Sequence, residues 1–236
     1  MGGSARSNSW LLVVLLGCFL VSPPVHGFKI GSAISSPCHE RITLHAFFAS
    51  DVLGGEQTLF PLEAFEGEVN DPSVVWLKIA KYLEAQVEHS FDSDLERFLA
   101  ITLFIGVRYP DQAGFSITDI NSLRNIHLAE EGQEEHALRA VDQDHEAGDA
   151  LAVETTRAYI LSVVDEAYNK FQKSRPTGGG AINKKSLRAQ SIDVNFWLEY
   201  YGTIKVDVWA PLFLMGRAAH ALQDSFPHTY RSADTN

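Results

Sequence analysis

Apolar residues recur at three- and four-residue spacing along most of this chain, and that period restricts its fold more than any other feature. An amphipathic helix is the structure that gathers such residues onto one buried face. No stretch alternates convincingly between apolar and polar residues, so we expect little β-structure. The stretches with the helical pattern are residues 37–48, 73–89, 94–107, 148–172, 186–202 and 206–224. The sequence therefore predicts an all-α fold.

Caps and prolines predict where several of these helices begin and end. Residues 71–72, Asp-Pro, are typical of a helix start, and Ser93 is expected to cap the following helix. We expect Pro110 to halt that helix and Pro227 to end the last one, because proline lacks the N–H that a helix needs. Two surface loops are expected from their turn-forming composition, at residues 111–119 and 173–185.

The first residues have the pattern of a secretory signal peptide. Arg6 gives a weakly positive start, and residues 10–21 form an apolar run too short to span a bilayer as a helix. Gly27 is a small residue that fits a cleavage site. We therefore expect residues 1–27 to be removed, Phe28 to become the N-terminus, and the protein to be secreted.

The expected mature chain, residues 28–236, is predicted to be one strongly acidic domain. The signal holds one of the 19 basic residues and none of the 30 acidic ones, which leaves 18 minus 30, or −12. Such a charge opposes binding to nucleic acid and anionic membranes unless bound cations or a local basic patch offset it. Cys38 is the only cysteine left, so a secreted domain would need a large core or a metal for rigidity. No later segment is long and apolar enough for a transmembrane anchor.

The most informative polar motif is HALQDSFPH at residues 220–228. His220 and Asp224 are four residues apart, so their side chains share one face of a helix. Their apolar neighbours predict burial, and a buried carboxylate without a partner is costly. We expect Pro227 to turn His228 back toward the same pocket. Imidazole and carboxylate are ligands that zinc favours, and the alternative is a plain His–Asp pair at a helix end.

This motif resembles the HxxxD…PxH signature of the zinc-dependent phospholipases C and of the single-strand-specific nucleases that share their all-α fold. In this chain the proline directly precedes His228, and the interval from Asp224 is shorter than in the phospholipases. The resemblance implies a single multi-helix domain of the zinc-dependent phospholipase C type with two or three zinc ions. It also implies hydrolysis of a phosphodiester by a metal-activated water.

The same resemblance implies metal ligands elsewhere in the chain. An early histidine of the family, matched by His39, binds one ion together with the first residue, which signal removal would make Phe28. An aspartate at a helix exit, matched by Asp111, binds an ion and orients the attacking water, so it is the implied catalytic residue. Asp224 would bridge two ions.

One further histidine ligand is expected between Asp111 and His220. We favour His136, because it interrupts an acidic stretch with apolar neighbours on both sides. His127 is a close second, and His145 has the surroundings of a solvated residue. The implied zinc ligands are Phe28, His39, Asp111, His136, His220, Asp224 and His228.

The resemblance leaves the number of ions and the substrate open. The family's third site uses a histidine and a glutamate four residues later, and no such pair lies between His228 and Asn236. We therefore expect either a chain truncated at its C-terminus or a site with two ions. A zwitterionic phospholipid suits an acidic exterior better than nucleic acid does, which ranks phospholipase-C-like cleavage with peripheral membrane contact first. Nuclease-like hydrolysis and a non-catalytic secreted helical protein are the alternatives, and the oligomeric state stays open.

Overall fold

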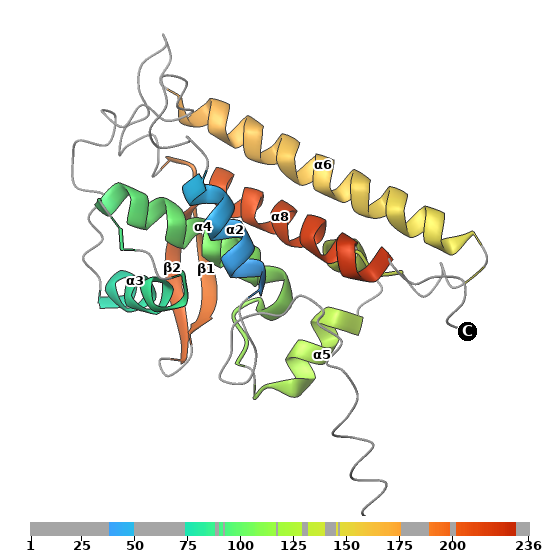
Figure 1. Cartoon of the computed structure of the whole chain (residues 1–236), viewed down its shortest axis with the longest axis horizontal. Helices are drawn as coiled ribbons and strands as arrows, with labels where there is room; N and C mark the ends of the chain where they lie inside the picture. The colour runs from blue at the N-terminus through green and yellow to red at the C-terminus, as the bar shows by residue number, and fades with distance from the viewer. Residues whose placement is uncertain are drawn as a thin grey trace, which may run out of the picture.

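Most of the described chain is helical, with one small two-stranded sheet (Figure 1). The computed structural model describes residues 38–49, 74–87, 90–91, 93–116, 118–128, 132–139, 145, 147–175, 189–198 and 202–229. In chain order its elements are helices α2 (Cys38–Ala49), α3 (Val74–Val87), α4 (Asp94–Gln112) and α5 (Ile120–Leu128), the 3-10 helix η3 (Gln133–His136), helix α6 (Gly148–Ser174), strands β1 (Ser191–Leu198) and β2 (Gly202–Trp209), and helix α8 (Ala210–Thr229). The prediction of a mostly α-helical chain is confirmed at that level.

Residues 191–198, in the middle of the helix predicted for residues 186–202, form strand β1 instead. Strands β1 and β2 pair antiparallel as a hairpin, which packs against α4. In β1 the buried Val194 and Phe196 alternate with the exposed Asp193 and Asn195. β-branched and aromatic residues fit such a half-buried strand, and a short apolar run satisfies helical and strand periods about equally well. The helix prediction was wrong for this reason.

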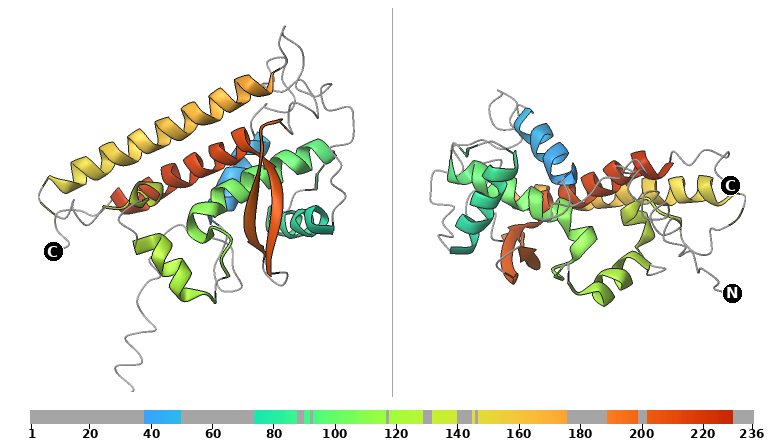
Figure 2. Two further views of the ribbon diagram at one scale, coloured as in Figure 1. Left: turned by 180° about the vertical axis from the view of Figure 1, so that it is seen from behind. Right: turned by 60° about the horizontal axis from the view of Figure 1, so that its bottom comes forward.

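The centre of the fold is the crossing of α4 and α8, where the two backbones come into direct contact. A Cβ atom at Gly216 would lie 2.6 Å from the main-chain oxygen of Leu103, and one at Gly106 would overlap the main chain of Phe213. Only glycine can occupy these two positions without moving a helix. Helix α6 runs beside α8 along much of its length (Figures 1 and 2). The polar residues that follow Gly106 on α4 are consequently held close to α8, and those that follow Gly216 on α8 are held close to α4.

Several predicted helix boundaries agree with the structure. Helix α3 lies within the predicted stretch 73–89, and α6 coincides closely with residues 148–172. The Ser93 hydroxyl caps α4 by accepting a hydrogen bond from the main-chain N–H of Glu96 at 3.0 Å. These ends are set by local sequence, which is why they could be predicted.

Pro110 does not end α4 as predicted. The helix continues to Gln112 and stops where Ala113 adopts the left-handed conformation (φ 43°), with its N–H bonded to the Tyr109 carbonyl. The proline removes one main-chain hydrogen bond near the helix end, and the packing of α4 against α8 outweighs that loss. Asp111 consequently lies in the last turn of the helix rather than beyond it.

Pro227 likewise lies inside a helix, because α8 runs on to Thr229. The predicted helix end at this proline is wrong, and so is the expected turn of the chain before His228. The side chain of His228 lies outside the described part of the structure, as do Phe28 and most of residues 173–185. Residues 113–116 and 118–119 connect α4 to α5 without regular structure, much as predicted.

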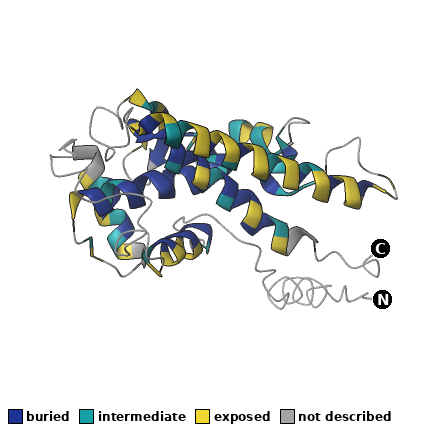
Figure 3. Cartoon of the chain, turned by 90° about the horizontal axis from the view of Figure 1, so that it is seen from above, coloured by how far each residue is buried: buried dark blue, intermediate teal, exposed yellow. Residues whose placement is uncertain are grey.

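Buried residues gather where α4 and α8 run through the interior, and the outward faces of the surrounding helices are exposed (Figure 3). The core joins these two helices to one face of the hairpin and to parts of α2, α3 and α6. Within the described ranges, no helix has both the length and the apolar character needed to cross a membrane.

Candidate metal centre

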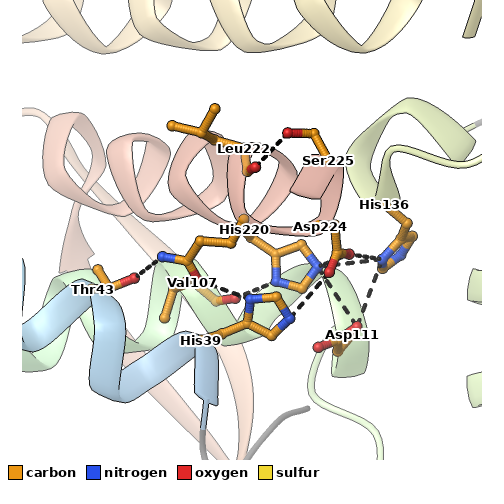
Figure 4. Close-up of polar contacts among 10 residues, drawn as sticks. His39, Thr43, Val107, Asp111, His136, His220, Leu222, Asp224 and Ser225 are labelled. Atoms are coloured by element: carbon orange, nitrogen blue, oxygen red, sulfur yellow. Dashed lines mark hydrogen bonds and ion pairs between the residues drawn. The ribbon is translucent and has the colours of Figure 1, made fainter. Parts of the chain in front are cut away.

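Five of the predicted ligand side chains point toward one another beside the α4–α8 crossing (Figure 4). They come from four elements: His39 from α2, Asp111 from α4, His136 from η3, and His220 and Asp224 from α8. They form two overlapping groups whose ligand atoms lie within 4.8 Å of one another. We call His39, His220 and Asp224 the first cluster, and Asp111, His136 and His220 the second cluster. Buried histidine and aspartate groups of this kind could hold a metal ion.

His39 is oriented by a chain of hydrogen bonds between α2 and α8. Its Nδ1–H donates to the Gln223 side-chain oxygen at 2.8 Å, and the Gln223 amide nitrogen donates to the Thr43 hydroxyl at 2.7 Å. The other ring nitrogen, Nε2, faces Asp224 and lies 3.2 Å from its Oδ1. A hydrogen bond on one ring nitrogen that presents the other inward is the usual support of a metal-binding histidine.

His220 is oriented in the same way by the backbone of α4. Its Nδ1–H donates to the carbonyl of Val107 at 2.9 Å, and its Nε2 lies 3.1 Å from Oδ2 of Asp224. Val107 follows Gly106, so the close helix crossing brings this carbonyl within reach of His220. The rings of His39 and His220 lie side by side, with their centroids 4.5 Å apart.

The second cluster joins α4 and η3 to α8. Oδ1 of Asp111 lies 3.6 Å from Nδ1 of His136 and 3.7 Å from Nε2 of His220. The same His136 atom is 3.3 Å from Nε2 of His220 and 3.5 Å from Oδ2 of Asp224. His136 and His220 therefore each direct one nitrogen toward both carboxylates, those of Asp111 and Asp224.

These separations match the edges of a metal coordination sphere. Two ligand atoms about 2.0–2.1 Å from a tetrahedral zinc ion lie about 3.3–3.4 Å from each other. The five separations just given among the four atoms, including that of His220 from Asp224, fall between 3.1 and 3.7 Å. We call the point between these four atoms the second position, and the point between Nε2 of His39 and Oδ1 of Asp224 the first position.

Asp224 is the carboxylate that belongs to both positions. Burial alone would raise its pKa, but hydrogen bonds from His136, His220 and His39 outweigh burial and hold the pKa well below its usual range. The group is therefore a charged carboxylate, with Oδ1 facing His39 and Oδ2 facing the other two histidines. A carboxylate placed in this way can bind two cations, one with each oxygen.

The charge of His220 shows how acidic this environment is. Burial opposes protonation of the ring, but the carboxylates of Asp111 and Asp224 outweigh it and raise the pKa of His220 to about 9. Without a bound cation, the ring is therefore protonated at neutral pH. A metal ion that binds Nε2 must displace that proton.

The centre opens to solvent on the Asp111 side. The side chain of His220 is fully buried and that of Asp224 is 7% exposed, whereas the side chain of Asp111 is 17% exposed. A water molecule or a substrate would approach the second position along this carboxylate.

The remaining histidines are placed differently. His127 on α5 lies beside the second cluster, with its ring 4.7 Å from that of His136, but it belongs to neither cluster. Burial and then the neighbouring His136 lower the pKa of His127. His145 is exposed, as its surroundings predicted. The structure thus places His136, rather than His127, within ion-pair distance of the carboxylates of Asp111 and Asp224.

Sequence reasoning missed the groups that orient the ligands. Gln223 carried a usable signal, because a glutamine next to Asp224 in an apolar stretch needs a buried partner. The Val107 carbonyl carried no signal in the sequence, since any residue supplies a carbonyl. Only the helix crossing determines that this carbonyl lies next to His220.

Comparison of the chain with protein-family models, with curated proteins and with solved structures found no match. The interpretation of the centre therefore depends on its geometry and on the motif around His220 and Asp224.

Proposed function

We propose that this protein is a secreted zinc-dependent phosphodiester hydrolase whose reaction is phospholipase-C-like cleavage of phospholipid head groups. The observation that carries the proposal is the set of five separations of 3.1–3.7 Å that link four ligand atoms at the second position, which Asp224 joins to the first position. Two cations held by a shared carboxylate suit this chemistry, because they can act on both the attacking and the leaving oxygen of a phosphodiester.

The ligand set fits zinc better than magnesium or calcium. Imidazole nitrogens and carboxylate oxygens in a four-ligand arrangement are typical of zinc, whereas the alkaline-earth ions take six or more oxygen ligands. The second position offers two of each, from His136, His220, Asp111 and Asp224. At the first position, His39 and Asp224 would be joined by the N-terminus at Phe28, as the resemblance implies.

The side chains have distinct roles in the proposed reaction. When bound, zinc neutralises charge on the phosphodiester and lowers the pKa of a coordinated water toward about 7. Asp224 would hold both ions, and Val107 and Gln223 keep the rings of His220 and His39 turned inward. Asp111 is the most exposed of these ligands and would orient the attacking water by accepting its hydrogen bond.

The resemblance to the zinc-dependent phospholipases C supports the reaction class. The matched residues follow the family's order along the chain, from His39 through Asp111 and His136 to His220 and Asp224. The formal charge of the expected mature chain favours a zwitterionic lipid over a polyanion as substrate. We accordingly place the fold with these all-α enzymes as part of the proposal.

The decisive experiment compares phosphatidylcholine vesicles with single-stranded DNA as substrates of the zinc-loaded protein. We expect release of phosphocholine that a chelator abolishes and added zinc restores. Asp111→Asn is the matched control, because it should keep the fold and lose the activity. Cleavage of DNA alone would favour the nuclease alternative, and zinc binding without either activity would favour a non-catalytic role. Less than one zinc ion per chain would reject the metal interpretation.

A further inference from the structure

His136 has a different kind of support from the other ligands of the centre. The helices that carry the other four, α2, α4 and α8, are 12, 19 and 20 residues long, whereas η3 has four residues. A single 3-10 turn does not hold its place through its own hydrogen bonds. Contacts from neighbouring elements must therefore determine where the His136 ring lies.

An ion pair joins η3 to α8 next to the ligands. The guanidinium of Arg217 contacts the carboxylate of Glu135, the residue directly before His136. Arg217 stands three residues before His220, so the pair ties η3 to the adjoining turn of the helix that carries this ligand. On the other side of η3, the Gln133 amide donates a hydrogen bond to the His127 carbonyl at 3.0 Å.

The surroundings of the pair make it more than a surface contact. The side chains of Arg217 and Glu135 are only 24% and 20% exposed, and η3 packs between α6 and α8. The Tyr159 hydroxyl of α6 is buried beside them without a hydrogen bond of good geometry. Burial, only partly offset by the positive charge of Arg217, raises the pKa of Tyr159 well above its usual range, so the phenol stays neutral. Partly shielded pairs of this kind are screened less by salt than exposed ones.

We propose that the Glu135–Arg217 ion pair positions His136 and thereby sets the affinity of the second position for its metal ion. The inference depends on the proposed metal function. Neither residue belongs to a cluster, so the pair acts through His136 and not as a ligand. The first position takes its described ligands from α2 and α8, and it should be insensitive to the pair.

Arg217→Met tests this role, because methionine keeps an apolar side chain and removes the charge and the donors. We expect the second zinc ion to bind about 10- to 100-fold more weakly, as for other residues that orient a metal ligand, with the first ion unchanged. Competition with a chromophoric chelator measures both affinities, and the absorption of the cobalt-substituted protein reports the geometry of the second position. Arg217→Lys should restore part of the loss, and Glu135→Gln should reproduce it without adding to Arg217→Met.

Arg97→Met is the matched control, because it removes an ion pair with Asp94 at the far end of α4 and should leave both ions unchanged. Amide exchange of residues 133–138 in the zinc-free protein gives a readout independent of metal, and Arg217→Met should accelerate it. Unchanged exchange, or equal weakening of both ions, would overturn the inference. A wild-type protein that binds no zinc would overturn the proposed function, whereas normal zinc binding by Arg217→Met would overturn only the positioning role.

Discussion

The two metal positions differ in what holds their ligands. The first takes His39 and Asp224 from long helices, and the crossing of α4 and α8 determines where α8 lies. The second also uses His136, whose element is a single 3-10 turn fixed by an ion pair and one amide hydrogen bond. Backbone packing therefore determines the geometry of the first position, and side-chain contacts determine that of the second. Mutations should therefore change the zinc affinity of one position without changing that of the other.

The largest effect should follow from Gly216→Ala, which disrupts the packing of α4 against α8 on which both positions depend. The added Cβ would lie 2.6 Å from the Leu103 carbonyl oxygen and must push α8 away from α4. We expect a loss of about 1–3 kcal/mol in the free energy of unfolding, and loss of both zinc ions. Thermal denaturation and elemental analysis measure the two effects. Met215→Ala, at the exposed neighbouring residue, should leave both nearly unchanged.

Asp224→Asn should remove both ions, whereas Asp111→Asn should remove only the second. Each oxygen of Asp224 faces a different position, and the carboxylate of Asp111 faces the second position alone. Both substitutions preserve side-chain shape, so circular dichroism should confirm an intact fold while elemental analysis counts zinc. Equal zinc loss in the two variants would show that the positions are not separate.

Gln223→Met should weaken the first position and spare the second. The substitution removes the acceptor of the His39 Nδ1–H, and loss of such an orienting partner lowers metal affinity about 10- to 100-fold. Zinc titration against a chelator gives both affinities. Leu222→Met, at an exposed residue one position earlier, is the control. An equal effect on the second ion would contradict the proposed separation.

The pH dependence of the zinc-free protein tests the charge on His220 rather than the separation of the two positions. Burial opposes protonation of His220, but Asp111 and Asp224 raise its pKa from 6.5 to about 9. A raised pKa contributes stability that is complete below pH 6.5 and is lost as the pH rises through about 9. The Tm without zinc should therefore fall over this interval, while zinc affinity rises because fewer protons are displaced.

His45→Gln provides the control for this pH profile, because His45 is an exposed residue of α2 outside both clusters. Its thermal denaturation curve should shift with pH as that of the wild type does. A wild-type Tm that stays constant from pH 6.5 to about 9 would contradict the raised pKa of His220.

The parts that could be predicted from sequence are those with a local signal. The Ser93 cap and the helical periods of α3 and α6 depend on neighbouring residues, and the structure agrees with them. The motif containing His220 and Asp224 indicated metal ligands because four-residue spacing on a helix fixes their relation. Five of the seven predicted ligands come together, and the side chains of Phe28 and His228 lie outside the described part.

The parts that could not be predicted depend on distant packing. The hairpin replaced a predicted helix because burial against α4 decided between two periods that the short run satisfied equally. Pro110 and Pro227 did not end their helices, since local propensity was outweighed by contacts with other elements. The Glu135–Arg217 pair joins residues 82 positions apart and leaves no spacing pattern to read.

The hydrogen bond between His39 and Gln223 spans 184 residues and joins the first and last described helices. During synthesis α2 leaves the ribosome long before α8, so His39 stays without this partner until nearly all of the described chain has emerged. Closing so large a loop costs conformational entropy, and no contact offsets that cost until α8 docks on α4. The order of translation thus delays assembly of the centre, and a chain that stalls before α8 cannot form either cluster.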